Sequence, residues 1–236
     1  MLQLFFGTKN RGKLRELRRL VAGLPVEVTS PEELDVELPE VVEDGHTFKE
    51  NAEKKAAAYA CLRGRYALAD DSGLCVDALG GAPGIFSARW SEVDRDLSSP
   101  ACELAREGAV ELGPELVRAA RDAANNEKLL ASLDGVAASA RGASYVAVLA
   151  LADPKGEIVA VVEGVCPGRI GLAPRGEGGF GYDPLFVPLE APGASGRTMA
   201  ELDPSEKDAI SHRGRAFRAL RAVLAELAFD KSGKER

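Results

Sequence analysis

Short apolar runs alternate with stretches of helical periodicity along the first part of the chain. Residues 3–6 predict a short buried strand, and leucine and valine then recur at the spacing of an apolar helix face over residues 14–21. The sequence Thr47-Phe48-Lys49-Glu50 has the pattern of a capping box, and apolar positions continue behind it to residue 60. The pattern therefore predicts a strand, a loop and a helix, followed by a second helix that begins at residue 48.

Two aspartates follow the next apolar run. Residues 66–69 predict a short strand that ends in Asp70-Asp71-Ser72-Gly73, and residues 74–76 resume a strand-like run. Side chains of neighbouring residues on an ideal strand point to opposite faces of the sheet. Both carboxylates can therefore reach one site only if the chain bends, and we expect Ser72 and Gly73 to supply that bend.

The rest of the chain combines helices with a long hairpin. Residues 99–133 are rich in Ala, Leu, Glu and Arg and predict two or three helices with a break at Gly113-Pro114. Residues 143–152 and 157–165 predict two strands, joined by an Asp-Pro-Lys-Gly sequence whose order suits a type I turn.

A short strand at residues 185–187 and an amphipathic helix over residues 217–227 complete the pattern. Because no repeat and no Ser/Gly-rich linker divides the chain, residues 1–236 are predicted to form one α/β domain with a mixed sheet and two lobes.

Composition and charge exclude several classes of protein. The chain has 236 residues, of which 45% are hydrophobic and 28% charged, so it can bury a core and is not disordered. Its 37 Asp and Glu residues outnumber its 30 Lys and Arg residues, which gives a net charge of -7. That sign is opposite to the one a nucleic-acid binder carries, so we predict no nucleic-acid partner and expect an anionic ligand to meet a local basic cluster.

The sequence predicts neither a membrane span nor a secretory signal. The longest apolar run, residues 145–152, is far shorter than the roughly 20 residues that cross a bilayer. The apolar start of the chain has no basic region before it and is too short for a signal peptide, so we predict a cytoplasmic protein. The four cysteines lie far apart and only two histidines are present, which argues against a zinc site and favours reduced thiols.

The loop before the first helix can bind phosphate. The segment from Gly7 to Lys13 places backbone N–H groups, a helix N-terminus and two lysines together. It also matches the spacing of a P-loop, but Leu14 stands where that mechanism needs a hydroxyl to hold magnesium. The alternative is a solvated basic helix start in which glycine merely serves the turn.

Asp70 and Asp71, with Glu43 upstream, can bind a hard cation. Magnesium prefers one or two carboxylates, with phosphate oxygens and water completing its shell. A calcium loop does not fit, because Gly73 comes too early. Taken alone, an Asp-Asp pair is more typical of a solvated turn.

A third candidate segment is rich in glycine. The sequence from Gly178 to Pro184 flanks Phe180 with glycines, so the ring can offer a stacking face to a flat ligand, or can pack against its own protein. A fourth segment, from Ser205 to Arg213, carries Lys207, His212 and Arg213 near the start of the last helix; its alternative reading is an exposed helix start.

Six segments taken in order resemble the inosine triphosphate pyrophosphatase family, from near the first residue to about residue 227. They are Thr8-Lys9-Asn10-Arg11-Gly12-Lys13, Phe48-Lys49-Glu50-Asn51-Ala52, Ala69-Asp70-Asp71-Ser72-Gly73-Leu74, Gly80-Gly81-Ala82-Pro83-Gly84-Ile85-Phe86-Ser87-Ala88-Arg89, Gly178-Gly179-Phe180-Gly181-Tyr182-Asp183-Pro184 and Ser211-His212-Arg213. Each segment is weakly specific alone, but the six in this order are jointly specific.

The resemblance implies an elongated α/β fold of two lobes around a twisted mixed sheet, with a cleft between the lobes. Bacterial members are dITP/XTP pyrophosphatases, so it also implies Mg²⁺-dependent hydrolysis of non-standard purine nucleoside triphosphates (dITP, ITP, XTP) to the monophosphate and pyrophosphate. The implied role is to clear deaminated purines from the nucleotide pool. A homodimer is implied as well.

The resemblance also implies a role for each matching residue. Asp71 resembles the general base, supported by Asp70, and Glu43 and Asp71 resemble the metal ligands. Lys207 and Lys55 resemble phosphate contacts together with the segment Thr8, Lys9, Asn10, Arg11, Gly12 and Lys13. The nucleoside-binding set is Ser72, Phe180, Gly181, Tyr182, Asp183, His212 and Arg213.

The chain departs from the family pattern in one region and leaves two other functions open. A helical insertion is predicted over about residues 92–124, as a lid, a dimer contact or a surface elaboration. The first rival function is a P-loop kinase or NTPase that acts on the terminal phosphate. The second is a nucleotide sensor that binds without turnover, for which the clustered acids have no use.

Overall fold

The structure is a computed structural model that describes residues 1–93, 113–191 and 196–233. Its first elements confirm the predicted pattern: strand β1 (Leu2–Phe6), helix α1 (Arg11–Leu20) and helix α2 (Phe48–Arg63). The cap of α2 differs in one detail from a capping box. Thr47 Oγ1 accepts a hydrogen bond from the N–H of Glu50 at 3.2 Å, but the Glu50 carboxylate accepts from the N–H of His46 instead of that of Thr47.

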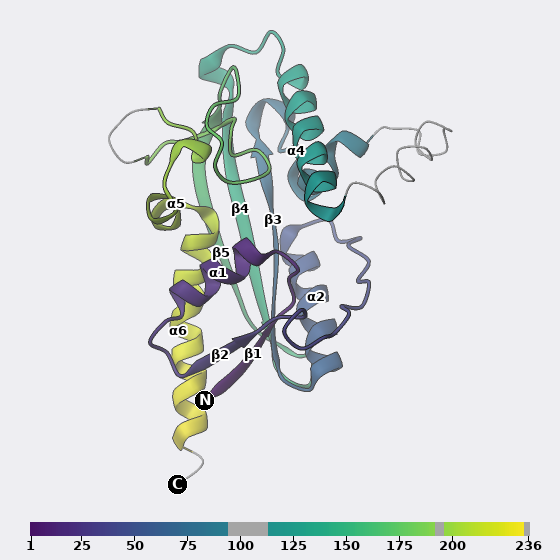
Figure 1. Ribbon diagram of the computed structural model, residues 1–236, viewed down its shortest axis with the longest axis vertical. Coiled ribbons are helices and arrows are strands. Elements are labelled where there is room, and N and C mark those ends of the chain that lie inside the picture. Colours follow the sequence, from purple (N-terminus) through teal and green to yellow (C-terminus); the bar gives the residue numbers. More distant parts are fainter. Residues whose placement is uncertain (94–112, 192–195, 234–236) are drawn as a thin grey trace. The chain divides into compact units, whose positions relative to one another are not determined.

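The strands form one mixed sheet of six, in the order β2-β1-β3-β4-β5-β6. The α/β class predicted from the sequence is therefore confirmed. Besides β1, the sheet contains β2 (Val26–Thr29), β3 (Tyr66–Val76), β4 (Gly142–Ala152), β5 (Ile158–Ile170) and β6 (Phe186–Pro188), of which β3, β4 and β5 are the long strands in Figure 1. β1 pairs in parallel with both β2 and β3, and β6 runs antiparallel to β5.

The remaining helices follow the predictions less closely. Helix α4 (Gly113–Ser132) begins at the predicted break, and the expected helices before it, with residues 94–112 of the predicted insertion, lie outside the described residues. The final helix α6 (His212–Gly233) begins earlier than its apolar face indicated. The short elements were not predicted: α5 (Pro204–Ile210) and the 3-10 helices η1 (Asp77–Leu79), η2 (Gly84–Glu92), η3 (Ala138–Ala140) and η4 (Met199–Glu201).

The hairpin between β4 and β5 closes through the predicted turn. The N–H of Gly156 donates to the carbonyl of Asp153 at 2.9 Å, which is the bond that joins the ends of a type I turn. The three cysteines that the structure describes, Cys61, Cys75 and Cys166, form no disulfide with one another, while Cys102 lies outside the described residues. No described helix is both long and apolar enough to cross a bilayer.

The chain divides into two compact units. The first unit comprises Met1–Ser72, Val146–Cys166 and Asp208–Arg236, and the second comprises Gly73–Tyr145 and Pro167–Lys207.

In the first unit, alternate residues of the strands bury themselves in two separate cores. Leu4 and Leu68 belong to a core that also holds apolar residues of α1 and α6. Phe5 and Ala69 belong to a second core, which holds Ala52, Ala56 and Tyr59 of α2. Because side chains alternate between the faces of a sheet, α1 and α6 cover one face and α2 covers the other.

In the second unit, polar side chains tie α4 to the segments around it. Asn125 of α4 accepts from the N–H of Ser91 at 2.7 Å and donates to the carbonyl of Ser87 in η2. At the other end of α4, the buried guanidinium of Arg141 donates to three carbonyls, those of Leu133, Val136 and Gly171. Arg141 therefore satisfies the carbonyls where α4 ends and joins them to the end of β5.

We expect Arg141→Met to lower the free energy of unfolding by about 2–4 kcal/mol, because three buried carbonyls lose a charged donor while the apolar part of the side chain is kept. Urea unfolding followed by circular dichroism measures the change. Arg169→Met, which removes the same charge from an exposed position of β5, is the control and should change stability by no more than about 0.5 kcal/mol. Equal effects of the two substitutions would contradict a structural role for Arg141.

Candidate active site

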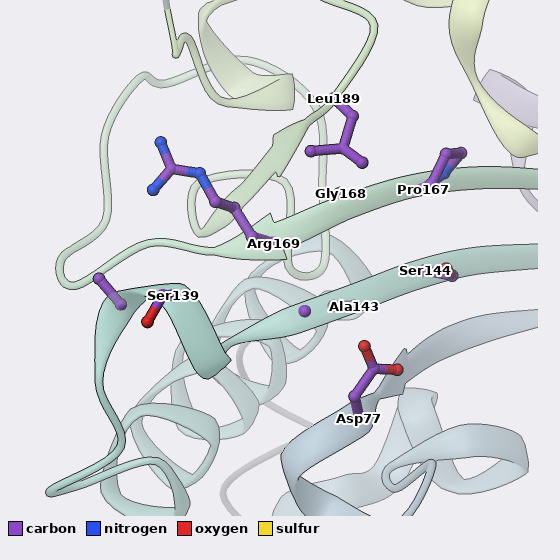
Figure 2. Close-up of a pocket in the computed structure, with 10 residues that line it drawn as sticks. Asp77, Ser139, Ala143, Ser144, Pro167, Gly168, Arg169 and Leu189 are labelled. Carbon is purple, nitrogen blue, oxygen red and sulfur yellow. The ribbon is translucent and has the colours of Figure 1, made fainter.

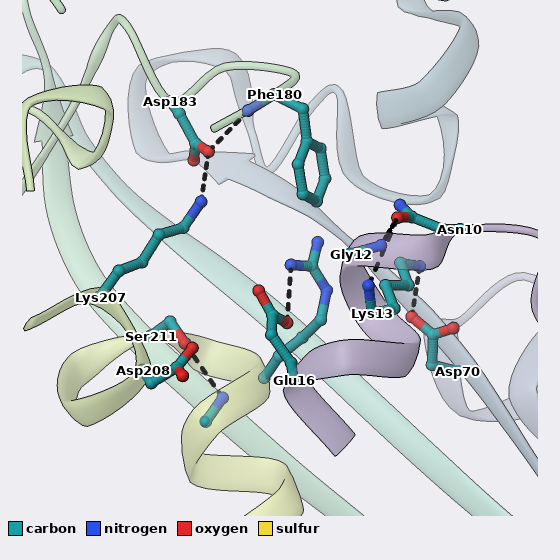
Figure 3. A network of polar contacts seen from close by, with 12 residues as sticks. Asn10, Gly12, Lys13, Glu16, Asp70, Phe180, Asp183, Lys207, Asp208 and Ser211 are labelled. Carbon is teal, nitrogen blue, oxygen red and sulfur yellow. Dashed lines mark hydrogen bonds and ion pairs between the residues drawn. The ribbon is translucent and has the colours of Figure 1, made fainter. Parts of the chain in front are cut away.

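Asp70 and Asp71 lie on opposite faces of β3. Asp70 follows Leu68 on the face covered by α1, and Lys13 of α1 lies with its Nζ 2.5 Å from Asp70 Oδ2 (Figure 3). Asp71 follows Ala69 on the face covered by α2, and there Lys55 Nζ lies 2.9 Å from Asp71 Oδ1. The alternation that builds the two cores therefore gives each carboxylate its own lysine.

The predicted bend after Asp71 is wrong. β3 continues without interruption through Ser72 and Gly73 to Val76. The two acids can still share a site because the neighbouring strand β1 ends at Phe6, which pairs with Leu68. Beyond that pair β3 has no β1 residue beside it, so groups from both faces can approach around its edge.

Charged groups from both faces act on the two acids, which are adjacent in the chain. Burial alone would raise the pKa of Asp70, but the cations of Lys13, Lys55 and Arg213 outweigh it and hold that pKa below its usual value. Burial raises the pKa of Asp71, although Lys55 opposes the rise. Asp70 is thus held as an ionised partner of the lysines, while Asp71 is the stronger proton acceptor of the two.

Glu43 joins the same cluster through Lys55. Its Oε1 lies 3.2 Å from Lys55 Nζ, so two carboxylates from distant segments meet at one ammonium group. Burial lowers the pKa of Lys55, but the charges of Asp71, Asp70 and Glu43 outweigh burial and raise it. The predicted metal ligands and the predicted cation Lys55 are therefore brought together.

Asn51 was missed by the sequence analysis as a member of this cluster. It is buried on α2 one turn before Lys55, and its amide donates to Asp71 Oδ2 at 3.4 Å while its carbonyl accepts from the N–H of Gly45 at 2.9 Å. The spacing of four residues between Asn51 and Lys55 could have indicated this, because residues four apart on a helix lie on the same face.

The loop from Gly7 to Lys13 differs from an open phosphate cradle. Asn10 is the N-cap of α1, and its side chain accepts from the N–H groups of Gly12 at 2.9 Å and Lys13 at 3.3 Å. Two of the backbone donors predicted to bind phosphate, those of Gly12 and Lys13, are therefore already bonded within the protein. Thr8 in turn accepts from the N–H of Asn10, so the loop holds its own shape.

The cations of this loop have separate environments. Arg11 is exposed and pairs with Glu32, Lys9 is exposed, and Lys13 is drawn to Asp70. Gly7 allows the loop to pass α2, since a Cβ there would lie 2.1 Å from the ring of Tyr59.

The start of α6 adds two buried residues to the first unit. His212 and Arg213 are 3% and 5% exposed, which excludes the alternative of an exposed helix start. Arg213 Nη1 lies 3.7 Å from the carboxylate of Glu16 on α1, and its charge contributes to the lowered pKa of Asp70. Arg213 therefore belongs to the same charged region as Lys13 and Asp70.

In the second unit, the glycine-rich loop is organised by Asp183. Its buried carboxylate accepts from the N–H of Phe180 at 3.0 Å and from Lys207 Nζ at 2.6 Å (Figure 3). Gly179 has a φ of +77°, and a Cβ at this position would lie 2.1 Å from Asp183 Oδ2. Only glycine allows the loop to fold over the carboxylate in this way.

Helix α4 holds the same loop from another side. Asp122 accepts from the N–H of Gly181 at 2.8 Å, and Asn126 donates to the carbonyl of Gly181 at 2.9 Å. Tyr182 donates its hydroxyl to the carbonyl of Ser87, and burial raises its pKa. Asp122 and Asn126 were missed, although their spacing of four residues places them on one helix face.

The second unit also contains a cavity of about 550 Å³ between β4, β5 and the segments that flank them (Figure 2). Asp77, Ser139, Ser144 and Arg169 supply its polar lining. None of the predicted site residues lines this cavity.

The chain matches the model of the Ham1 family over residues 4–223. It is 62% identical over 232 residues to a dITP/XTP pyrophosphatase of Anaeromyxobacter dehalogenans, covering 96% of this chain and 99% of that protein. It is 44% identical to the dITP/XTP pyrophosphatase of Streptomyces coelicolor, with 96% of this chain and 99% of that protein covered.

Two solved structures are similar as well. A HAM1 protein from Coxiella burnetii has a TM-score of 0.76 and 36% identity, covering 96% of this chain and all of that one. A nucleoside-triphosphatase / dITP/XTP pyrophosphatase from Mycobacterium abscessus has a TM-score of 0.66 and 41% identity, covering 93% and 98% of the two chains. These likenesses confirm the resemblance found in the sequence.

We expect Lys13→Met to lower the free energy of unfolding by about 2–3 kcal/mol, because Asp70 stays buried and loses its nearest counter-charge. Chemical denaturation at neutral pH measures this loss. Lys9→Met removes the same charge from an exposed position and should cost no more than about 0.5 kcal/mol.

The double variant Lys13→Met/Asp70→Asn should recover part of the loss, because it removes the uncompensated carboxylate as well. If the double variant is less stable than Lys13→Met alone, the destabilisation does not come from the charge left on Asp70.

Proposed function

The chain belongs to the Ham1 family, and on that basis we propose that it hydrolyses dITP, ITP and XTP to the nucleoside monophosphate and pyrophosphate. Relatives that match almost the whole chain carry the name dITP/XTP pyrophosphatase, which supports this substrate class. The observation that carries the proposal is the meeting of Glu43 and Asp71 at Lys55, with Asp70 and Lys13 beside them.

The residues around Lys55 fit Mg²⁺. The carboxylates of Glu43 and Asp71 already reach one cation, at 3.2 Å and 2.9 Å, and such hard oxygens suit Mg²⁺. Within the described residues no group of three or more acidic, His or Cys side chains is arranged to hold a metal alone, so phosphate oxygens and water would complete the shell. When bound by Glu43 and Asp71, Mg²⁺ supplies positive charge to the phosphate oxygens.

The chain's own residues then have distinct tasks. Lys13, Lys55 and Lys207 bind the phosphates, together with Lys9 and Arg11 from the exposed side of the loop. Asp71 accepts a proton from the attacking water while the oxygen of that water bonds to the α-phosphorus. The bond from that phosphorus to the bridging oxygen breaks, and pyrophosphate leaves.

Base selection follows from matched donors and acceptors. In the proposal, Phe180 stacks on the purine, and His212 and Arg213 donate to the oxygen at its position 6. Adenine presents an amino group there, so donor would face donor, and buried groups would be left without partners. ATP should therefore be a poor substrate.

The P-loop alternative is disfavoured by the loop itself. A P-loop uses free backbone N–H groups to hold phosphate, whereas those of Gly12 and Lys13 are bonded to Asn10. Residue 14 is leucine, which has no hydroxyl for magnesium. A sensor without turnover has no use for the clustered carboxylates, of which Asp70 is buried at a cost in desolvation.

The products decide between these functions. The purified chain, incubated with Mg²⁺ and separately with ITP, dITP, XTP, GTP, ATP or CTP, should release pyrophosphate and a monophosphate from the first three. Orthophosphate as the product would favour the P-loop function instead. Binding of ITP without any product would favour the sensor.

The cellular context is part of the same proposal. We propose that the enzyme clears deaminated purines from the nucleotide pool of the cytoplasm and that it does so as a homodimer. Sedimentation of the purified chain tests the dimer independently of activity.

We expect Asp71→Asn to lose nearly all turnover of ITP, by about 10³-fold or more, because an amide can neither accept the proton nor bind Mg²⁺ as a carboxylate does. Pyrophosphate release measures the rate, and thermal unfolding checks that the fold survives. Asp77→Asn, just beyond the end of β3 and outside the proposed site, is the matched control. Turnover by Asp71→Asn at the parent rate would remove Asp71 from the reaction.

A further inference from the structure

One face of α4 carries three polar residues that all meet the glycine-rich loop. Arg118, Asp122 and Asn126 are spaced by four residues, so they lie one above the other on the helix. Asp122 accepts from the N–H of Gly181, and Asn126 donates to the carbonyl of the same residue. The guanidinium carbon of Arg118 lies 4.6 Å from the centroid of the neighbouring Phe180 ring.

Arg118 differs from the other cation at this ring in how it is held. Lys207 Nζ lies 5.2 Å from the ring centroid and is fixed by its ion pair with Asp183. Arg118 is exposed and forms no hydrogen bond or ion pair with any other residue in the described ranges. An exposed cation–π contact is weak, so the guanidinium can move away from Phe180 at little cost.

We propose that Arg118 is a base-contacting residue, whose guanidinium closes over a purine stacked on Phe180. The proposal rests on the proposed function, because it takes Phe180 as the surface on which the purine stacks. A guanidinium is planar, weakly hydrated and attracted to the face of an aromatic ring. Once the base lies on Phe180, the base offers the guanidinium a second aromatic face at the same place.

The helix geometry supports this assignment. Asp122 and Asn126 hold the N–H and the carbonyl of Gly181, which keeps the backbone of the preceding residue, Phe180, close to α4. Arg118 lies one turn before Asp122, and its side chain is long enough to follow a base as it is inserted. Arg118 also lies within the insertion of about residues 92–124, so the proposal gives part of that insertion a place in the nucleoside site.

Calorimetry with two ligands separates a base contact from a general effect of charge. Inosine monophosphate carries a base, whereas inorganic tripolyphosphate does not. Arg118→Met keeps the length of the side chain and removes its planar cation. We expect this substitution to weaken the binding of inosine monophosphate about three- to tenfold, which is the size of a partly exposed cation–π contact. The affinity for tripolyphosphate should stay unchanged.

Three further variants sharpen the test. Arg121→Met removes the same charge from the same helix, where Arg121 pairs with Glu92, and should change neither affinity. Arg118→Lys keeps the charge but loses the planar group, and should show an intermediate loss for inosine monophosphate. In a Phe180→Leu background, adding Arg118→Met should weaken the binding of inosine monophosphate by less than about twofold, because the stack is already lost. In turnover of ITP, the loss for Arg118→Met should appear in KM more than in kcat.

The outcomes distinguish this inference from the proposed function. If Arg118→Met weakens tripolyphosphate as much as inosine monophosphate, or weakens neither, the base contact is wrong even where the parent chain releases pyrophosphate from ITP. If the loss persists in the Phe180→Leu background, the base contact is also wrong. If the parent chain releases no pyrophosphate but Arg118→Met selectively weakens inosine monophosphate, the base contact stands and the proposed function is wrong.

Discussion

The structure of the first unit depends on how two adjacent carboxylates, one buried and one partly buried, are accommodated on one strand. Asp70 and Asp71 must face opposite sides of β3, and a buried carboxylate is costly unless a cation accompanies it. The chain meets this constraint with one lysine from each covering helix, Lys13 from α1 and Lys55 from α2. The layering of helix, sheet and helix therefore also supplies the charges, because each covering helix contributes one lysine.

The same arrangement limits how a polyphosphate can bind. Lys13 and Lys55 already form ion pairs with Asp70 and Asp71, so a phosphate competes with these carboxylates for the same ammonium groups. A divalent ion between Glu43 and Asp71 would replace the charge that Lys55 supplies to them and would leave Lys55 able to turn to phosphate. In the proposed reaction, metal and substrate are thus expected to bind together, because each removes the electrostatic obstacle to the other.

The sequence predicted those features whose cause is local. Thr47 caps α2 and the Asp-Pro-Lys-Gly turn closes the hairpin, because both depend on residues only a few positions apart. The bend after Asp71 was wrong because the early end of β1, which makes the bend unnecessary, is a property of a different strand. The N–H groups of α1 were a local feature that was misjudged: asparagine is among the strongest N-cap residues, and Asn10 stands immediately before the helix.

Helix periodicity explains why α4 contacts the glycine-rich loop with residues from more than one turn. Asp122 and Asn126 bind the N–H and the carbonyl of Gly181, so this face of α4 lies against the loop. Any residue four positions before Asp122 on a continuous helix must then lie on the same side, and the long side chain of Arg118 reaches the ring next to that peptide. A sequence that extends α4 by one turn toward its N-terminus therefore brings a new side chain to the loop without altering the loop itself. The residue type at position 118, here an arginine, therefore decides which side chain contacts the ring of Phe180.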